Sequence, residues 1–136
     1  MNLSKDLKKT RVMNGVAAGT SDQNSSSVDM QNFEGVLFIA AFEALTATQV
    51  TQIKVQQGKL ADGSDMADLA ATLVGPLADA DGNKVLAVDV YRPRERYVRL
   101  VVDRGTANAV IDGVIAVQYG ARKMPTTHAA SVAASE

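Results

Sequence analysis

The sequence of 136 residues contains no cysteine and no tryptophan, and its single histidine is His128. Without cysteine there are no disulfide bonds and no thiolate–zinc sites. One histidine is too few for a multi-histidine metal centre or a histidine relay, and the GxSxG motif of serine hydrolases is missing. We therefore expect no catalytic residues, no metal and no cofactor, and we predict that the protein is not an enzyme.

Excess charge of one sign and long apolar segments are also missing. The 14 Lys and Arg residues are balanced by 15 Asp and Glu residues, so the composition gives no reason to expect nucleic-acid binding. The longest strongly apolar run, residues 36 to 42, is far shorter than the ~20 residues of a membrane-spanning helix. The first six residues lack the apolar segment of a secretory signal. We predict no nucleic-acid, membrane or small-molecule partner.

Apolar and polar residues alternate in several segments, which is the pattern of strands with one wet face. Thr51, Ile53 and Val55 alternate with polar residues, and residues 86–91 and 98–103 show a similar period of two. Two other segments, FEGVLFIAAF (33–42) and AVIDGVIAVQY (109–119), are apolar on both parities. Such strands are covered on both faces, either inside a sandwich or against another subunit. We predict that both are core strands, with Ile39 and Ile115 buried.

Turn-forming residues separate these segments, and no long amphipathic helix is present. This pattern predicts an all-β fold, an antiparallel, jelly-roll-like β-sandwich of ~8 strands. We expect three parts: a basic N-terminal arm at residues 1–11, a β-sandwich domain at 12–120 and a C-terminal tail at 121–136. The two ends have little apolar periodicity, so we expect them to be extended and to be ordered by a partner.

Arginines are concentrated after the segment that ends at Tyr91. Arg92, Arg94 and Arg96 project to one side if this part of the chain is extended. A group of guanidinium donors is suited to binding carboxylates on a partner chain, although a solvated loop is an equally good interpretation. The candidate partner interface comprises Lys5, Lys8, Lys9, Arg11, Arg92, Arg94, Arg96, Arg122 and Lys123.

Acidic residues in the loops suggest a second kind of site. Asp79, Asp81 and Asn83 stand at alternate positions, as oxygen ligands do in calcium loops. The bidentate glutamate that completes such a loop does not follow at the required spacing. Ordinary turn chemistry is therefore the favoured interpretation, and cation binding by Asp79 and Asp81 is left open.

Three longer strings carry a resemblance to a known family. They are SSVDMQNFEGVLFIAAFEALTATQVTQIKVQQ (26–57), DVYRPRERYVRLVV (89–102) and RGTANAVIDGVIAVQYGARKMPTTH (104–128). In these segments the chain resembles small structural proteins of tailed bacteriophages and prophages, and among them head cement (decoration) proteins. The resemblance implies a jelly-roll subunit that binds the major capsid protein on the capsid exterior, ties neighbouring capsomers together and forms a homodimer there. It also implies synthesis in the host cytoplasm.

Two alternative functions are consistent with the same sequence. A component of a phage tail or of the head–tail joint would also be a small β-rich structural protein. A carbohydrate-binding jelly-roll module is disfavoured, because sugar-binding platforms use exposed Trp and Tyr. This chain has no Trp and only three Tyr.

Overall fold

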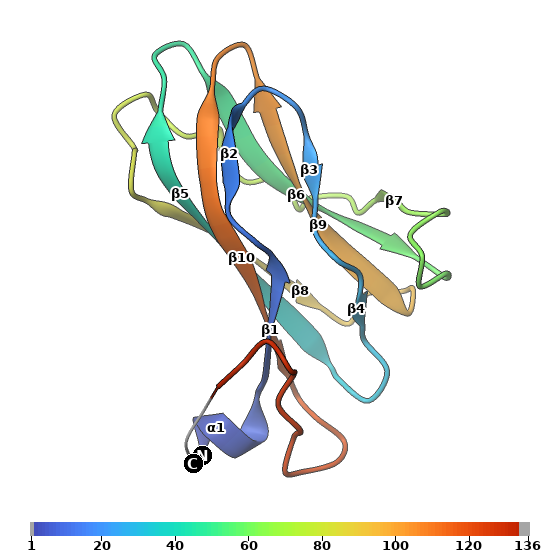
Figure 1. The fold of residues 1–136 in the computed structure, drawn as a ribbon. Helices are drawn as coiled ribbons and strands as arrows, with labels where there is room; N and C mark the ends of the chain where they lie inside the picture. The colour runs from blue at the N-terminus through green and yellow to red at the C-terminus, as the bar shows by residue number, and fades with distance from the viewer. Residues whose placement is uncertain (1, 134–136) are drawn as a thin grey trace.

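The computed structural model describes residues 2 to 133, which form two antiparallel β-sheets packed face to face (Figure 1). The one helix in these residues is the short α1 (Leu3–Asp6). Sheet A contains β1 (Lys8–Met13), β2 (Val16–Gly19), β5 (Gly35–Leu45), β8 (Val85–Tyr91) and β10 (Ala109–Tyr119). Sheet B contains β3 (Gln23–Asn24), β4 (Val28–Asp29), β6 (Val50–Gly58), β7 (Ala67–Asp68) and β9 (Tyr97–Gly105). The predicted all-β sandwich is confirmed.

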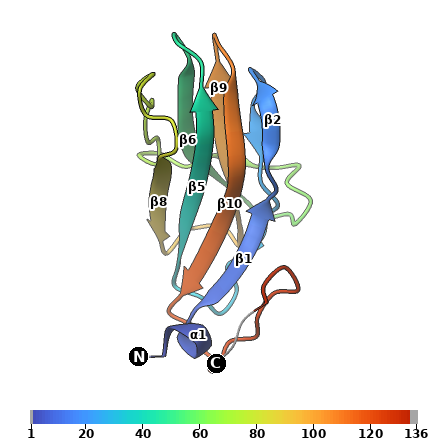
Figure 2. The ribbon, with the colours of Figure 1, turned by 60° about the vertical axis from the view of Figure 1, so that its left-hand side comes forward.

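The strand order places the longest strands in the middle of each sheet. Sheet A has the order β1–β10–β5–β8, and β2 also pairs with β10 (Figure 2). Sheet B has the order β3–β9–β6–β7, and β4 also pairs with β9. The chain crosses between the sheets after β2, β4, β5, β7, β8 and β9. This alternation is compatible with the predicted jelly roll.

The alternation seen in the sequence matches the burial of the side chains. In β6, Thr51, Ile53 and Val55 are buried, while Gln52 and Lys54 between them are partly exposed. Successive side chains of a strand point to opposite faces, so the buried set lies between the sheets. The three segments with a period of two are therefore strands, as predicted.

The core lies between the inner faces of the two sheets. Sheet A contributes Phe38, Phe42 and Ile111, and sheet B contributes Leu100 and Val102, all of them at most 1% exposed. Full burial of an apolar side chain of this size stabilises the fold by about 1.5–3 kcal/mol. The core therefore holds the sandwich together without disulfide bonds.

The two segments that are apolar on both parities became β5 and β10, neighbouring strands at the centre of sheet A. Their core position is correct, but the predicted burial of Ile39 and Ile115 is wrong. These residues face each other on the outer face of sheet A, where Ile39 is partly exposed and Ile115 is 47% exposed. A strand with apolar residues on both parities does not reveal which parity faces the core.

The chain ends are more tightly attached to the sandwich than the division into arms suggested. Lys8 is the first residue of β1 and pairs with Gln118, so residues 8–11 belong to sheet A. Thr126 is buried, and its backbone N–H donates to Lys5 O at 2.8 Å. The start of the chain and the segment after β10 therefore lie side by side (Figures 1 and 2). Residues 134–136 of the expected tail lie outside the described residues.

Candidate functional site

Three segments that are far apart in the sequence meet at one end of the sandwich. They are the β4–β5 loop, the β8–β9 loop and the chain after β10. Backbone hydrogen bonds fix them to one another: Arg92 N to Glu34 O at 2.7 Å, Met30 N to Arg96 O at 2.8 Å, and Arg122 N to Asn32 O at 2.9 Å. These bonds position the side chains of all three segments on one surface.

This surface collects most of the predicted basic residues. Four arginines line one hollow, and two lysines line a neighbouring hollow that also includes Gln31 and Phe33 from the first. We call the six residues the basic end: Lys8, Arg92, Arg94, Arg96, Arg122 and Lys123. The structure thus brings together six of the nine residues of the predicted interface.

Two of the arginines are paired within the chain. Arg96 donates to both carboxylate oxygens of Asp29, at 3.0 and 2.8 Å, and also to Gln31 Oε1 at 2.7 Å. The hydrogen bond from Arg96 lowers the pKa of Asp29 below its usual value. Arg92 forms a single ion pair with Glu34 at 3.2 Å. These two guanidinium groups orient the loops and have fewer donors left for a partner.

The other two arginines of the basic end keep their donors available. The Arg94 backbone N–H donates to Gln57 Oε1 at 3.2 Å, but its guanidinium makes no hydrogen bond or ion pair with residues 2 to 133. The Arg122 side chain is likewise exposed and has no such bond within this range. A planar guanidinium fits a carboxylate with two parallel hydrogen bonds. The basic end is therefore suited to an acidic surface.

The remaining predicted residues lie elsewhere. Lys9 and Arg11 are on the outer face of sheet A, opposite Val117 and Ile115 of β10. Lys5 belongs to α1 and lines neither hollow of the basic end, although its backbone oxygen accepts hydrogen bonds from Thr126, which lines the hollow of Lys8 and Lys123. The predicted interface is therefore divided, with Lys9 and Arg11 on the outer face of sheet A, away from the basic end.

Arg104 has a different role from the other arginines that follow Tyr91. It is 4% exposed, and its guanidinium donates to the backbone oxygens of Ala17, Ser21 and Ala109 at 2.8 to 2.9 Å. These oxygens belong to β2, to the chain before β3 and to β10. Arg104 therefore ties the end of β9 to sheet A and is not available to a partner.

Sequence reasoning did not identify an apolar hollow on the outer face of sheet A. Its floor includes Ile39, Ala41, Ile115 and Val117, and residues 131–133 lie at its border. The signal for this feature was the apolar character of β5 and β10 on both parities. One of the two interpretations of that signal was coverage by another subunit, and for this face it stays a prediction.

The acidic loops use their carboxylates to bind the backbone. Asp79 accepts from Thr48 N at 2.9 Å, and Asp81 accepts from Ala78 N at 3.0 Å and pairs with Lys84. The hydrogen bond from Lys84 lowers the pKa of Asp81. Within residues 2 to 133, no three His, Cys, Asp or Glu residues are grouped to hold a metal ion. His128 lies in the segment after β10.

Comparison with known proteins gave no matching family and no similar curated protein. Within the described part of the chain, no helix has the length and apolar character needed to cross a bilayer.

Proposed function

We propose that this protein is a non-enzymatic virion structural protein, a cement or decoration protein. It binds the outer surface of a bacteriophage capsid through the major capsid protein and stabilises the shell by bridging neighbouring capsomers. The sequence resemblance supplies this class. The observation that carries the proposed contact is the basic end, where Arg94 and Arg122 present guanidinium groups from two distant parts of the chain that have no partner among residues 2 to 133.

The basic end is physically suited to such a role. Exposed ion pairs contribute only about 0–1 kcal/mol each, so a single contact holds a subunit weakly. A subunit that contacts two capsomers, or a dimer with two basic ends, gains affinity because its second contact is intramolecular. Binding to the assembled shell alone then stabilises that shell by mass action. A homodimer on the capsid exterior fits this scheme.

The test is sedimentation of the purified protein with shells assembled from the major capsid protein encoded by the same genome. We expect the double variant Arg94→Glu/Arg122→Glu to bind at least about tenfold more weakly than wild type, because two attractive contacts become repulsive. Rising salt should weaken wild-type binding, because exposed charges are screened beyond ~8 Å at physiological ionic strength.

Lys59→Glu is the matched control. Lys59 is exposed directly after β6, does not line the basic end, and its side chain makes no hydrogen bond with residues 2 to 133. The Lys59→Glu variant should sediment with shells as wild type does. Equal binding of the double variant and the control, with no effect of salt, would assign attachment to an apolar surface. Failure of wild type to sediment at any salt concentration would refute the proposed function.

A further inference from the structure

Strand β8 is an unusually open edge of the sandwich. It spans Val85–Tyr91, pairs with β5 without any shift in register, and has no second neighbour in sheet A among the described residues. The other three sheet edges are short or interrupted. Strands β3, β4 and β7 contain two residues each, and the β1–β2 edge has a bulge after Arg11 and two basic side chains, Lys9 and Arg11, on its outer face. Short edge strands, bulges and basic side chains are the features by which proteins prevent a sheet edge from pairing with another chain.

The register shows which backbone groups of β8 are open. Phe42 N donates to Lys84 O at one end of the strand pair, and Arg92 N donates to Glu34 O at the other. Hydrogen-bonded positions alternate in an antiparallel pair, so the even-numbered residues of β8 bond to β5. The N–H and C=O groups of Val85, Ala87, Asp89 and Tyr91 point away from the sheet, and no hydrogen bond joins them to another residue in 2 to 133.

We propose that β8 pairs antiparallel with β8 of a second copy of this chain, so that the two A sheets become one continuous sheet. The two-fold axis passes beside Val88, which places Ala87 opposite Asp89 and Val85 opposite Tyr91 of the other copy. All four outward-pointing residues of each strand then fall at hydrogen-bonded positions. An interface of this kind is isologous, because the same strand serves both subunits.

The side chains favour this register over its neighbours. Val85 and Tyr91 are 59% and 58% exposed, among the most exposed large apolar residues in the described part of the chain, and the pairing places each opposite the other. Aromatic and β-branched residues are a favourable cross-strand pair. A shift of two residues in one direction places Asp89 opposite Asp89, and the opposite shift leaves Tyr91 without its apolar partner.

The one charge on β8 is also compatible with pairing. Asp89 accepts a hydrogen bond from Tyr119 Oη at 2.6 Å, which draws the carboxylate back over sheet A. Tyr119 reaches it by crossing Gly35, where a Cβ would lie only 2.2 Å from the ring. The glycine thus allows a contact that moves the carboxylate away from the open edge.

This inference rests on the proposed function only in that it gives the homodimer a defined contact, and the dimer itself is measured without capsids. Sedimentation velocity across a concentration series should show a wild-type dimer. Ala87→Pro removes an N–H that points to the open edge and leaves the hydrogen bonds to β5 in place. It should raise the dimer dissociation constant at least about tenfold, because both copies lose a bond and gain a clash. Ala87→Ser keeps the N–H and should dimerise as wild type does.

A cysteine variant tests the register and does not depend on the folding of the proline variant. The chain has no cysteine, so Val88→Cys introduces a single thiol at the two-fold axis. The facing residues of a non-hydrogen-bonded pair lie ~4.5 Å apart at Cα, within the range of a disulfide. Mild oxidation should give covalent dimers much faster than Ala70→Cys, a control in an exposed loop position.

Two results would overturn the self-pairing. One is a dimer that is unaffected by Ala87→Pro while Val88→Cys cross-links no faster than Ala70→Cys. The other is a wild-type monomer at every concentration tested. If that monomer sedimented with shells and Ala87→Pro did not, the β8 edge would bind a strand of the capsid protein instead. Salt-dependent binding of wild type to shells would stand in either case, so the two proposals fail independently.

Discussion

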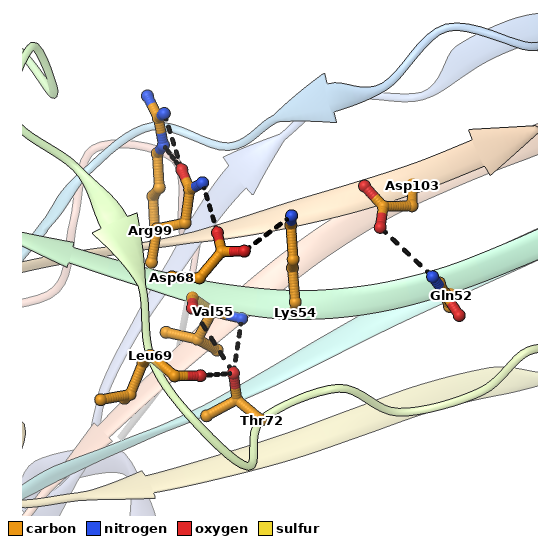
Figure 3. Close-up of polar contacts among 9 residues, drawn as sticks. Gln52, Lys54, Val55, Asp68, Leu69, Thr72, Arg99 and Asp103 are labelled. Carbon is orange, nitrogen blue, oxygen red and sulfur yellow. Dashed lines mark hydrogen bonds and ion pairs between the residues drawn. The ribbon is translucent and has the colours of Figure 1, made fainter.

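The outer faces of the two sheets differ in how their side chains are satisfied. On sheet B, polar side chains bind one another: Lys54 and Gln56 contact Asp68, Arg99 contacts Gln56, and Gln52 contacts Asp103 (Figure 3). On sheet A, the central strands present mostly apolar side chains, among them Ile39, Ile115 and Val117. The polar side chains on the outer face of sheet B thus hydrogen-bond to one another, whereas the outer face of sheet A exposes apolar side chains.

The edges beside β6 and β8 show the same contrast. Segment 67–77 covers the free edge of β6, where Leu69 N donates to Val55 O and Leu77 N donates to Thr51 O, both at 2.9 Å. The edge at β8 has no such cover within residues 2 to 133. Both differences concern sheet A: its outer face exposes apolar side chains, and its β8 edge has backbone groups without hydrogen bonds to residues 2 to 133. This asymmetry is the basis for proposing that sheet A, at its β8 edge, meets a second copy of the chain.

The largest expected effect is a loss of stability on substituting the inner face of sheet A, compared with a small loss on its outer face. Phe38 and Ile115 lie on neighbouring strands, but Phe38 is fully buried and Ile115 is 47% exposed. Phe38→Ala should lower the free energy of unfolding by about 3–5 kcal/mol, because it leaves a cavity. Ile115→Ala should lower it by less than about 1 kcal/mol, as surface substitutions do. Urea denaturation at low protein concentration measures both values. Equal losses would mean that the outer face is buried in solution.

A smaller loss is expected from exposing the edge of β6. Thr72 is 8% exposed, and its hydroxyl accepts from Val55 N at 3.0 Å and donates to Leu69 O at 2.7 Å (Figure 3). Thr72→Val keeps the shape of the side chain but leaves both backbone groups unpaired. It should cost about 1–3 kcal/mol of unfolding free energy in the same assay.

The matched control for that variant is Thr127→Val. Thr127 is exposed, and its hydroxyl makes no hydrogen bond with residues 2 to 133. This change should leave the urea midpoint nearly unchanged. If Thr72→Val were as mild as the control, the covering segment would be held by its backbone bonds alone, and the contrast between the two edges would be weaker than the structure indicates.

The sequence was sufficient to predict the fold class, because the alternation in segments such as 51–56 depends only on local geometry. It was not sufficient to orient β5 and β10. Both parities of these strands are apolar, so the burial of Ile115 could not be decided without its neighbours in the sheet. The covering of β6 by segment 67–77 was also beyond prediction, since it depends on backbone hydrogen bonds from Leu69 and Leu77 and on a contact between the Thr72 hydroxyl and Val55 N, none of which follows from a local pattern.

The candidate interface was partly predictable for a similar reason. Arg92, Arg94 and Arg96 were grouped by spacing alone, and they do line one hollow. The sequence did not predict that Lys8 and Lys9 lie on different surfaces, because residues 8–11 were expected to form an arm. They belong to a strand instead, and a strand places neighbouring residues on opposite faces. The burial of Arg104 depends on carbonyl groups up to 87 residues away, which a local pattern does not reveal.

The smallest effect concerns the paired charges of sheet B. Hydrogen bonds from Gln56 and Lys54 lower the pKa of Asp68, so its contribution to stability is present above the unfolded value of about 3.9 and is lost as pH falls through the folded value. Asp68 is largely exposed, so Asp68→Asn should cost less than about 1 kcal/mol at pH 7. This cost should vanish near pH 2 in urea titrations. Asp112→Asn, on the outer face of sheet A, removes a carboxylate that has no hydrogen bond within residues 2 to 133 and should change stability at neither pH. A cost for Asp68→Asn that persisted in acid would show that the polar network of sheet B does not act through the charge of Asp68.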